Sequence, residues 1–199
     1  MSCGDLRRLR TMSTPPALVL IDVQQGMDDP KWGARNNPDA EHEIGSLLAA
    51  WRELKWPVIH VQHMSKEADS PLRPDSPGNE LKPVARPREG EPLFQKTVNS
   101  AFIGTTLEAH LRREGIGSLL MVGITTDHCV STTARMASNL GFEVIVVGDA
   151  TATFERTGPD GAWYSAEQMH RAALASLHGE FAQVQSTEDV LRRLHPEGV

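Results

Sequence analysis

The chain has 199 residues, of which 39% are hydrophobic and 23% are charged, and its formal net charge at pH 7 is -6. This size and composition fit one soluble globular domain with a single large core. The acidic balance argues against a nucleic-acid or anionic-membrane surface, and no apolar run approaches the ~20 residues of a transmembrane helix. We therefore expect no nucleic acid and no membrane as a partner.

The N-terminal segment differs from the rest of the chain. Residues 1–14 are basic but lack the apolar stretch of a secretory signal, so we expect a flexible arm followed by a single domain over residues 15–199. A misassigned start, with the domain beginning near Met12, is an equally good interpretation. The two cysteines, Cys3 and Cys129, do not form a disulfide framework, which indicates a reducing compartment and hence the cytoplasm.

Short apolar runs along the chain predict strands. Runs that are continuously apolar, rather than alternating, are typical of a parallel sheet that is buried on both faces. A further short extended piece, Phe94-Gln95-Lys96, lies between the second and third runs. The runs are residues 17–22, 57–61, 118–123, 143–147 and 181–184.

Helical patterns alternate with these runs and predict a doubly wound α/β sandwich. The first helix follows Asn37-Pro38, and the segment 129–140 forms another, which Gly141 ends. Two further helices are expected after the capping-box patterns Thr105-x-x-Glu108 and Ser165-x-x-Gln168. Residues 63–93 contain six prolines and little periodicity, so we expect a long loop over a sheet edge or over the mouth of the active site.

Three reactive side chains follow separate strands. Asp22 ends the first run, Lys96 ends the short extended piece, and Cys129 follows the run at 118–123 by a tight turn. Because ligands of open α/β sheets bind at the carboxyl ends of the strands, we expect the three to share one edge. A helix start and the Lys96 ammonium would lower the pKa of the Cys129 thiol, and Asp22 would transfer its proton.

Each of these residues also has an ordinary structural interpretation. Cys129 fits a small buried hydrophobic residue, Asp22 a turn residue, and Lys96 a solvated surface lysine. The case for chemistry therefore depends on the three occurring together at the same edge.

Several segments resemble the isochorismatase-like cysteine hydrolases, in the order in which that family has them and over residues 17 to 185. The resemblance implies a three-layer α/β/α sandwich, Rossmann-type, with a six-stranded, mostly parallel sheet. It also implies a catalytic triad of Asp22, Lys96 and Cys129. The segments are Ala17-Leu18-Val19-Leu20-Ile21-Asp22-Val23-Gln24, Phe94-Gln95-Lys96 with Asn99-Ser100-Ala101-Phe102, Val122-Gly123-Ile124-Thr125-Thr126-Asp127-His128-Cys129-Val130, and Gly148-Asp149-Ala150-Thr151-Ala152.

The resemblance also implies an oxyanion site. The family has a cis peptide in the nucleophile turn, which here joins Ile124 to Thr125. In this arrangement the backbone N–H groups of Thr125 and Cys129 form the oxyanion hole.

The chain departs from the relatives that act on nicotinamide, which bind a metal through an Asp-x-His pair. His63-Met64-Ser65 stands at that place, and the side chains of His60 and His63, three apart on an extended segment, point to opposite faces. We therefore expect no metal and no other cofactor. Cleavage of isochorismate itself is acid-catalysed vinyl-ether chemistry that needs no thiol, so Cys129 favours amide hydrolysis.

We predict a cysteine hydrolase that cleaves a C–N bond of a small amide, ureido or carbamoyl compound through a thioester. Relatives commonly self-associate, so the expected state is a homo-oligomer. The expected pocket residues are Gln24, Trp32, Asn99, Phe102 and Phe154.

Two alternatives stay open at this point. The first is an isochorismatase-type vinyl-ether hydrolase in which Cys129 is a bystander. The second is a non-catalytic thiol-based sensor or binding protein, for which Cys3 is the available resolving thiol.

Overall fold

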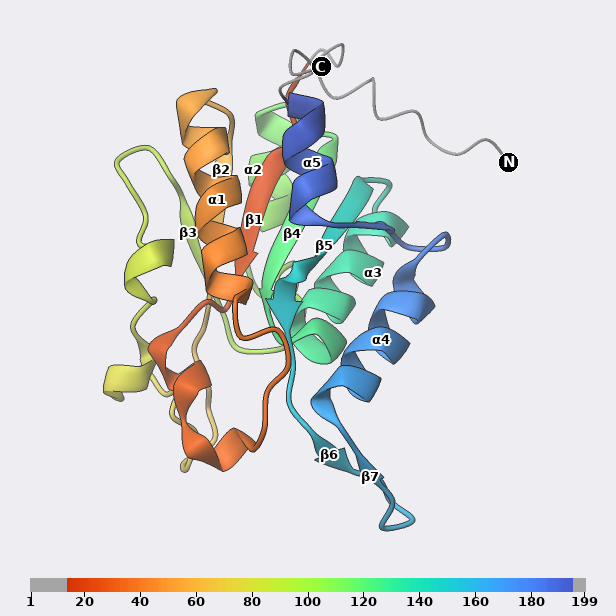
Figure 1. Cartoon of the computed structure of the whole chain (residues 1–199). Coiled ribbons are helices and arrows are strands. Elements are labelled where there is room, and N and C mark those ends of the chain that lie inside the picture. The colour runs from red at the N-terminus through yellow and green to blue at the C-terminus, as the bar shows by residue number, and fades with distance from the viewer. Residues whose placement is uncertain (1–13, 195–199) are drawn as a thin grey trace.

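The fold is a three-layer α/β/α sandwich, seen in a computed structural model that describes residues 14–194 (Figure 1). Cys3 and all but the last residue of the predicted arm lie outside this range. The central sheet has six parallel strands in the order β3-β2-β1-β4-β5-β8. The strands are β1 Ala17–Ile21, β2 Val58–His63, β3 Leu93–Lys96, β4 Ser118–Ile124, β5 Glu143–Ala152 and β8 Gln183–Gln185.

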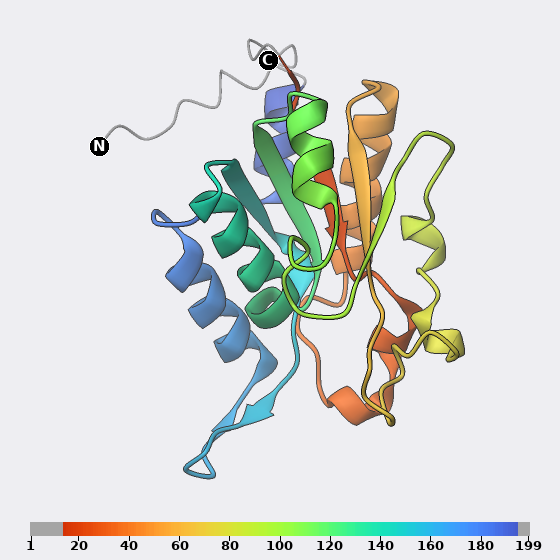
Figure 2. The same ribbon diagram turned by 180° about the vertical axis from the view of Figure 1, so that it is seen from behind.

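Helices cover both faces of this sheet, as the continuously apolar strands predict. Strands β1 and β4 are buried along their whole length. Alternate residues of β1 face opposite cores: Val19 packs toward α2, α3 and α4, whereas Leu18 packs toward α1 and α5. Figure 2 shows the layer of α2, α3 and α4 in front of the sheet. The helices are α1 Ala40–Glu53, α2 Leu107–Arg113, α3 Ser131–Asn139, α4 Ala166–Leu177 and α5 Thr187–Leu194.

The two predicted capping boxes have different outcomes. At α4, the Ser165 hydroxyl accepts from the Gln168 N–H and the Gln168 side chain accepts from the Ser165 N–H, which confirms the prediction. At α2 the box is absent: Thr106 is the cap, and Thr105 donates instead to the carbonyl of Ala101. None of the described helices is long and apolar enough to cross a membrane.

Smaller elements surround the carboxyl edge of the sheet. Strands β6 Arg156–Thr157 and β7 Trp163–Tyr164 form a short antiparallel hairpin beyond β5. Single helical turns occur in the loops that follow β1 and β2 and directly after β4. These turns are η2 Gln25–Asp28, η3 Pro30–Trp32, η4 Pro77–Asn79, η5 Pro83–Ala85 and η6 Thr126–Val130.

Candidate active site

Four polar side chains meet at the carboxyl edge of the sheet. Asp22 directly follows β1, His63 and Lys96 are paired last residues of β2 and β3, and Cys129 lies in η6 after β4. The parallel topology therefore brings together the three residues predicted from sequence and adds His63 to them.

The backbone at this edge has an unusual conformation. Asp22 has a φ of 52°, in the left-handed region of backbone conformation, which costs energy for residues other than glycine. At Gly123, φ is 125° and an added Cβ would lie 2.0 Å from the carbonyl oxygen of Ile21, so only glycine fits. The peptide bond between Ile124 and Thr125 is cis, as the family resemblance implies.

Lys96 is the centre of the polar cluster. Its Nζ lies 2.6 Å from Asp22 Oδ2, 3.0 Å from His63 Nδ1 and 3.3 Å from Cys129 Sγ. The side chains of Lys96 and Asp22 are both completely buried. A buried ammonium beside a carboxylate forms a fixed pair of charges that water does not screen.

The pKa of the Cys129 thiol is shifted in the direction opposite to the prediction. Burial and the Asp22 carboxylate raise the pKa of the Cys129 thiol and outweigh the opposing effect of Lys96. The helix-start prediction itself holds, because η6 runs directly into α3 and Cys129 lies near the start of this continuous helical segment. The expectation of a low thiol pKa is nevertheless wrong for the ligand-free site, which holds a neutral thiol beside an ion pair.

A cavity of about 280 Å³ opens beside this cluster. Of the predicted pocket residues, Trp32, Asn99 and Phe154 line it, and the rings of Trp32 and Phe154 stack with their centroids 6.0 Å apart. Residues of the long loop form another wall, so this loop borders the mouth of the site, as predicted. The remaining lining residues are Asp22, Met27, His63, Ser65, Glu67, Ser70, Leu72, Thr125, His128, Cys129 and Arg156.

Two predicted pocket residues do not line this cavity. The amide of Gln24 is completely buried, donates to the carbonyl oxygens of His63 and Asn79, and accepts from the N–H of His63. Phe102 packs into the helical layer, where its ring stacks on Phe142. For both residues the pocket prediction is wrong, because internal partners hold the side chain away from the cavity.

Two buried oxygen atoms of pocket-lining residues lack a hydrogen-bond partner in the described part of the chain. They are Asp22 Oδ1 and Thr125 Oγ1. A buried polar atom without a partner is costly, which is typical of functional sites. The carboxylate oxygen Asp22 Oδ1 can accept a proton, whereas the hydroxyl of Thr125 can donate a hydrogen bond.

Sequence reasoning did not assign several lining residues to the pocket. Arg156 donates to Asp127 at 2.9 Å, and Asp127 is one of the residues between the cis peptide and Cys129. His128 also borders the pocket, directly before the nucleophile candidate. The nucleophile segment was a signal for His128, whereas nothing in the sequence places Arg156, which lies on the short strand β6.

The residues of this cluster do not fit the metal that relatives acting on nicotinamide bind. In the described part of the chain, Asp22, His63 and Cys129 form the one group whose ligand atoms could surround an ion, all within 4.8 Å of one another. The Lys96 ammonium contacts all three side chains, so a cation already lies among these atoms. His60 is on the other face of β2, where it contacts Glu91 at 2.9 Å.

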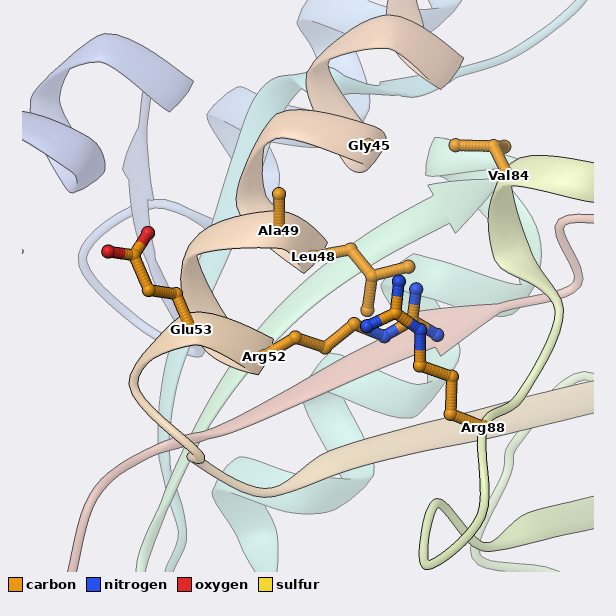
Figure 3. A pocket seen from close by; sticks show the side chains of 7 residues that line it. All are labelled: Gly45, Leu48, Ala49, Arg52, Glu53, Val84 and Arg88. Carbon is orange, nitrogen blue, oxygen red and sulfur yellow. The ribbon is translucent and has the colours of Figure 1, made fainter.

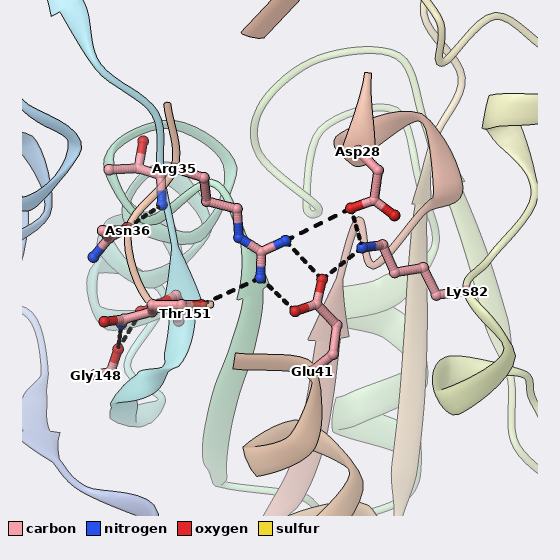
Figure 4. Close-up of polar contacts among 9 residues, drawn as sticks. Asp28, Arg35, Asn36, Glu41, Lys82, Gly148 and Thr151 are labelled. Carbon is pink, nitrogen blue, oxygen red and sulfur yellow. Dashed lines mark hydrogen bonds and ion pairs between the residues drawn. The ribbon is translucent and has the colours of Figure 1, made fainter. Parts of the chain in front are cut away.

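An ion cluster supports the loops that carry the pocket walls. Figure 4 shows Arg35 and Lys82 between the carboxylates of Asp28 and Glu41. Burial alone would raise the pKa of Glu41, but hydrogen bonds from Arg35 and Lys82 lower it to about 2. The cluster joins η2, the start of α1 and the long loop.

A second hollow, of about 500 Å³, lies between α1 and the loop after η5, and none of its lining residues borders the first cavity. Figure 3 shows the residues that line it, among them Arg52 of α1 and Arg88 of the loop. Arg52 is paired with Glu91 at 2.7 Å, and Glu91 also contacts His60. This network ties α1 to β2, which indicates a structural role.

The fold is a parallel α/β/α sandwich with a buried polar cluster and a cavity at the carboxyl edge of its sheet. A family model described as the isochorismatase domain matches residues 16–189. The chain belongs to the isochorismatase family.

Two proteins illustrate this similarity. YrdC of Bacillus subtilis, an uncharacterized isochorismatase-family protein, is 43% identical over 180 residues, which are 90% of this chain and 96% of YrdC. A crystal structure from Chromobacterium violaceum, assigned to the same family, has 46% identity and a TM-score of 0.88, over 91% of this chain and 94% of that one.

Other relatives have names that state an activity. Nicotinamidase 3 of Arabidopsis thaliana is 33% identical, over 89% of this chain and 77% of its own length. Streptothricin hydrolase of Streptomyces noursei is 32% identical, over 70% of this chain and 50% of its own length.

Proposed function

We propose that the protein hydrolyses a C–N bond of a small amide, ureido or carbamoyl compound, with Cys129 as the nucleophile. The observation that carries the proposal is the contact between Cys129 Sγ and a buried Lys96–Asp22 ion pair, at the wall of a cavity. Relatives named for the hydrolysis of nicotinamide and streptothricin support this chemistry. A cavity of about 280 Å³ limits the substrate to a small molecule.

The first half of the reaction forms a thioester. The thiol proton passes to Asp22, whose Oδ1 is free, while Cys129 sulfur bonds to the substrate carbonyl carbon. The electron pair of the carbonyl moves to oxygen, where the N–H groups of Thr125 and Cys129 stabilise the negative charge. The C–N bond then breaks, and Asp22 gives its proton to the leaving ammonia or amine.

The second half restores the enzyme. A water molecule gives a proton to Asp22 and bonds to the thioester carbon, and the C–S bond breaks. Cys129 sulfur takes the proton back from Asp22, and the carboxylic acid leaves. Lys96 stays protonated throughout and stabilises the sulfur anion each time it forms.

The raised pKa of the resting thiol fits this sequence of steps. A neutral thiol attacks poorly, so the reaction depends on transfer of the thiol proton to Asp22, which leaves the thiolate beside Lys96. Aromatic rings of Trp32 and Phe154 give the cavity an apolar wall for the organic part of the substrate.

A screen for ammonia release over small amides and ureides tests the proposal. The wild-type protein is run beside Cys129→Ala, and Cys3→Ser serves as the matched cysteine control. We expect release by the wild type and the control and none above background from Cys129→Ala. Equal release by all three would refute the thiol mechanism, and full turnover of a vinyl ether by Cys129→Ala would support the alternative in which the thiol is a bystander.

A further inference from the structure

His63 is the residue of the polar cluster to which the proposed reaction gives no task. It is partly buried at the end of β2, lines the cavity, and lies opposite Lys96 in the sheet register. Its Nδ1 is 3.0 Å from Lys96 Nζ.

The proton count around Lys96 fixes the role of this nitrogen. An ammonium has three N–H donors and no acceptor. The three neighbours of Lys96 Nζ are Asp22 Oδ2, Cys129 Sγ and His63 Nδ1, one for each proton. His63 Nδ1 must therefore present a lone pair, which places the ring proton on Nε2.

The surroundings of His63 favour this neutral form. Burial and the Lys96 ammonium lower the pKa of His63 and outweigh the opposing effects of Asp22 and Glu67. Nε2 has no hydrogen-bond partner among the described residues, so its N–H can donate to a molecule in the cavity.

The backbone of His63 is held on both sides. Its N–H donates to Gln24 Oε1 at 2.9 Å, and its carbonyl accepts from Gln24 Nε2 at 3.0 Å and from Asn79 Nδ2 at 2.8 Å. Gln24 is completely buried and Asn79 nearly so. Two buried amides that bind the backbone N–H and carbonyl of His63 fix where the imidazole lies.

We infer that His63 is a positioning residue for Lys96: its neutral imidazole accepts the third ammonium proton and holds the ammonium between Asp22 and Cys129. The inference rests on the proposed role of Cys129. Without this acceptor, one ammonium proton would be unsatisfied in a buried site, and Lys96 would move toward water and away from the sulfur. The sulfur anion would then lose its stabilising charge.

The tautomer of His63 gives a test that does not depend on catalysis. Long-range 15N NMR of the full chain at pH 7 distinguishes the two ring nitrogens, and the signals that vanish in His63→Asn identify the residue among the eight histidines. We expect a neutral ring with the proton on Nε2. A proton on Nδ1, or a doubly protonated ring, would overturn the inference even if Cys129 proves to be the nucleophile.

Alkylation of Cys129 by iodoacetamide tests the consequence for the thiol. The variants are His63→Leu, which removes the acceptor, and His63→Asn, whose amide oxygen can take the place of Nδ1, both in a Cys3→Ser background. At pH 7.5 we expect His63→Leu to slow alkylation about tenfold and His63→Asn to stay within about threefold of the parent, the effect of one charge-assisted hydrogen bond. Equal slowing in both variants, or no slowing in His63→Leu, would contradict the inference. If the thermal midpoint of His63→Leu shows that this variant folds poorly, the alkylation rate of His63→Asn and the tautomer seen by NMR decide.

Discussion

Removing the charge of Lys96 is the most informative change for stability. Lys96→Met keeps the approximate length of the side chain but leaves the buried Asp22 carboxylate without its ion-pair partner. Both side chains are completely buried, and Lys96 Nζ lies 2.6 Å from Asp22 Oδ2. Because loss of one member of a buried pair leaves an uncompensated charge, we expect the free energy of unfolding to fall by about 3–5 kcal/mol.

Urea unfolding followed by circular dichroism measures this change. With a denaturant slope of roughly 1–3 kcal/mol/M, the unfolding midpoint should fall by at least about 1 M. Lys31→Met is the matched control, because Lys31 is paired with Asp69 at 3.4 Å on an exposed surface, and its loss should cost below about 1 kcal/mol.

A double variant isolates the charge as the cause. Adding Asp22→Asn to Lys96→Met removes the uncompensated carboxylate, so the double variant should be more stable than Lys96→Met alone. If Lys96→Met costs no more than the exposed control, or if the double variant is no more stable than the single one, an unpaired buried charge is not what destabilises the Lys96 variant.

Three further predictions concern the supports and walls of the pocket. Since the pKa of Glu41 is lowered in the folded state, its stabilising effect is complete above its ordinary pKa of 4.5 and is lost as the pH falls toward about 2. Urea unfolding at several pH values across this range should show that the free energy of unfolding falls by about 1–2 kcal/mol, after allowance for solvent screening. The variant Glu41→Gln should not show this loss. Gln24→Leu should lower the free energy of unfolding by roughly 2–4 kcal/mol, because it leaves the buried backbone groups of His63 unpaired, and an unchanged urea midpoint would speak against the amide contact. For a substrate found by the ammonia screen, Phe154→Ala should raise KM about tenfold, whereas Phe102→Ala should lower the thermal midpoint and leave KM unchanged; the opposite result would return Phe102 to the pocket.

The sequence predicts much of the sheet because its signals are local. Continuously apolar runs arise where a strand is buried on both faces, and β1 and β4 show this over their whole length. Parallel strands then bring their carboxyl ends to one edge, which is why Asp22, Lys96 and Cys129 could be placed together.

Other elements of the fold are not predicted from the sequence. Strands β6 and β7 have two residues each, too few for any periodic pattern. The helix α5 does have a signal, since Val190 and Leu194 are four residues apart and both are buried, yet it was not predicted.

The errors in the site concern properties that depend on tertiary contacts. The direction of the Gln24 side chain is set by Asn79, which is distant in sequence, and that of Phe102 by Phe142. The pKa of the Cys129 thiol depends on burial and on the Asp22 carboxylate, which a helix-start pattern does not reveal.

The mass of the Cys129 peptide during turnover tests the proposed thioester most directly. An amide that releases ammonia is mixed with excess wild-type protein, the reaction is stopped with acid within milliseconds to seconds, and the peptides are analysed by mass spectrometry. We expect the peptide containing Cys129 to gain the mass of the acyl group transiently, and Cys129→Ala to show neither adduct nor turnover. Release of ammonia with no adduct on Cys129, together with undiminished turnover by Cys129→Ala, would contradict the thiol mechanism.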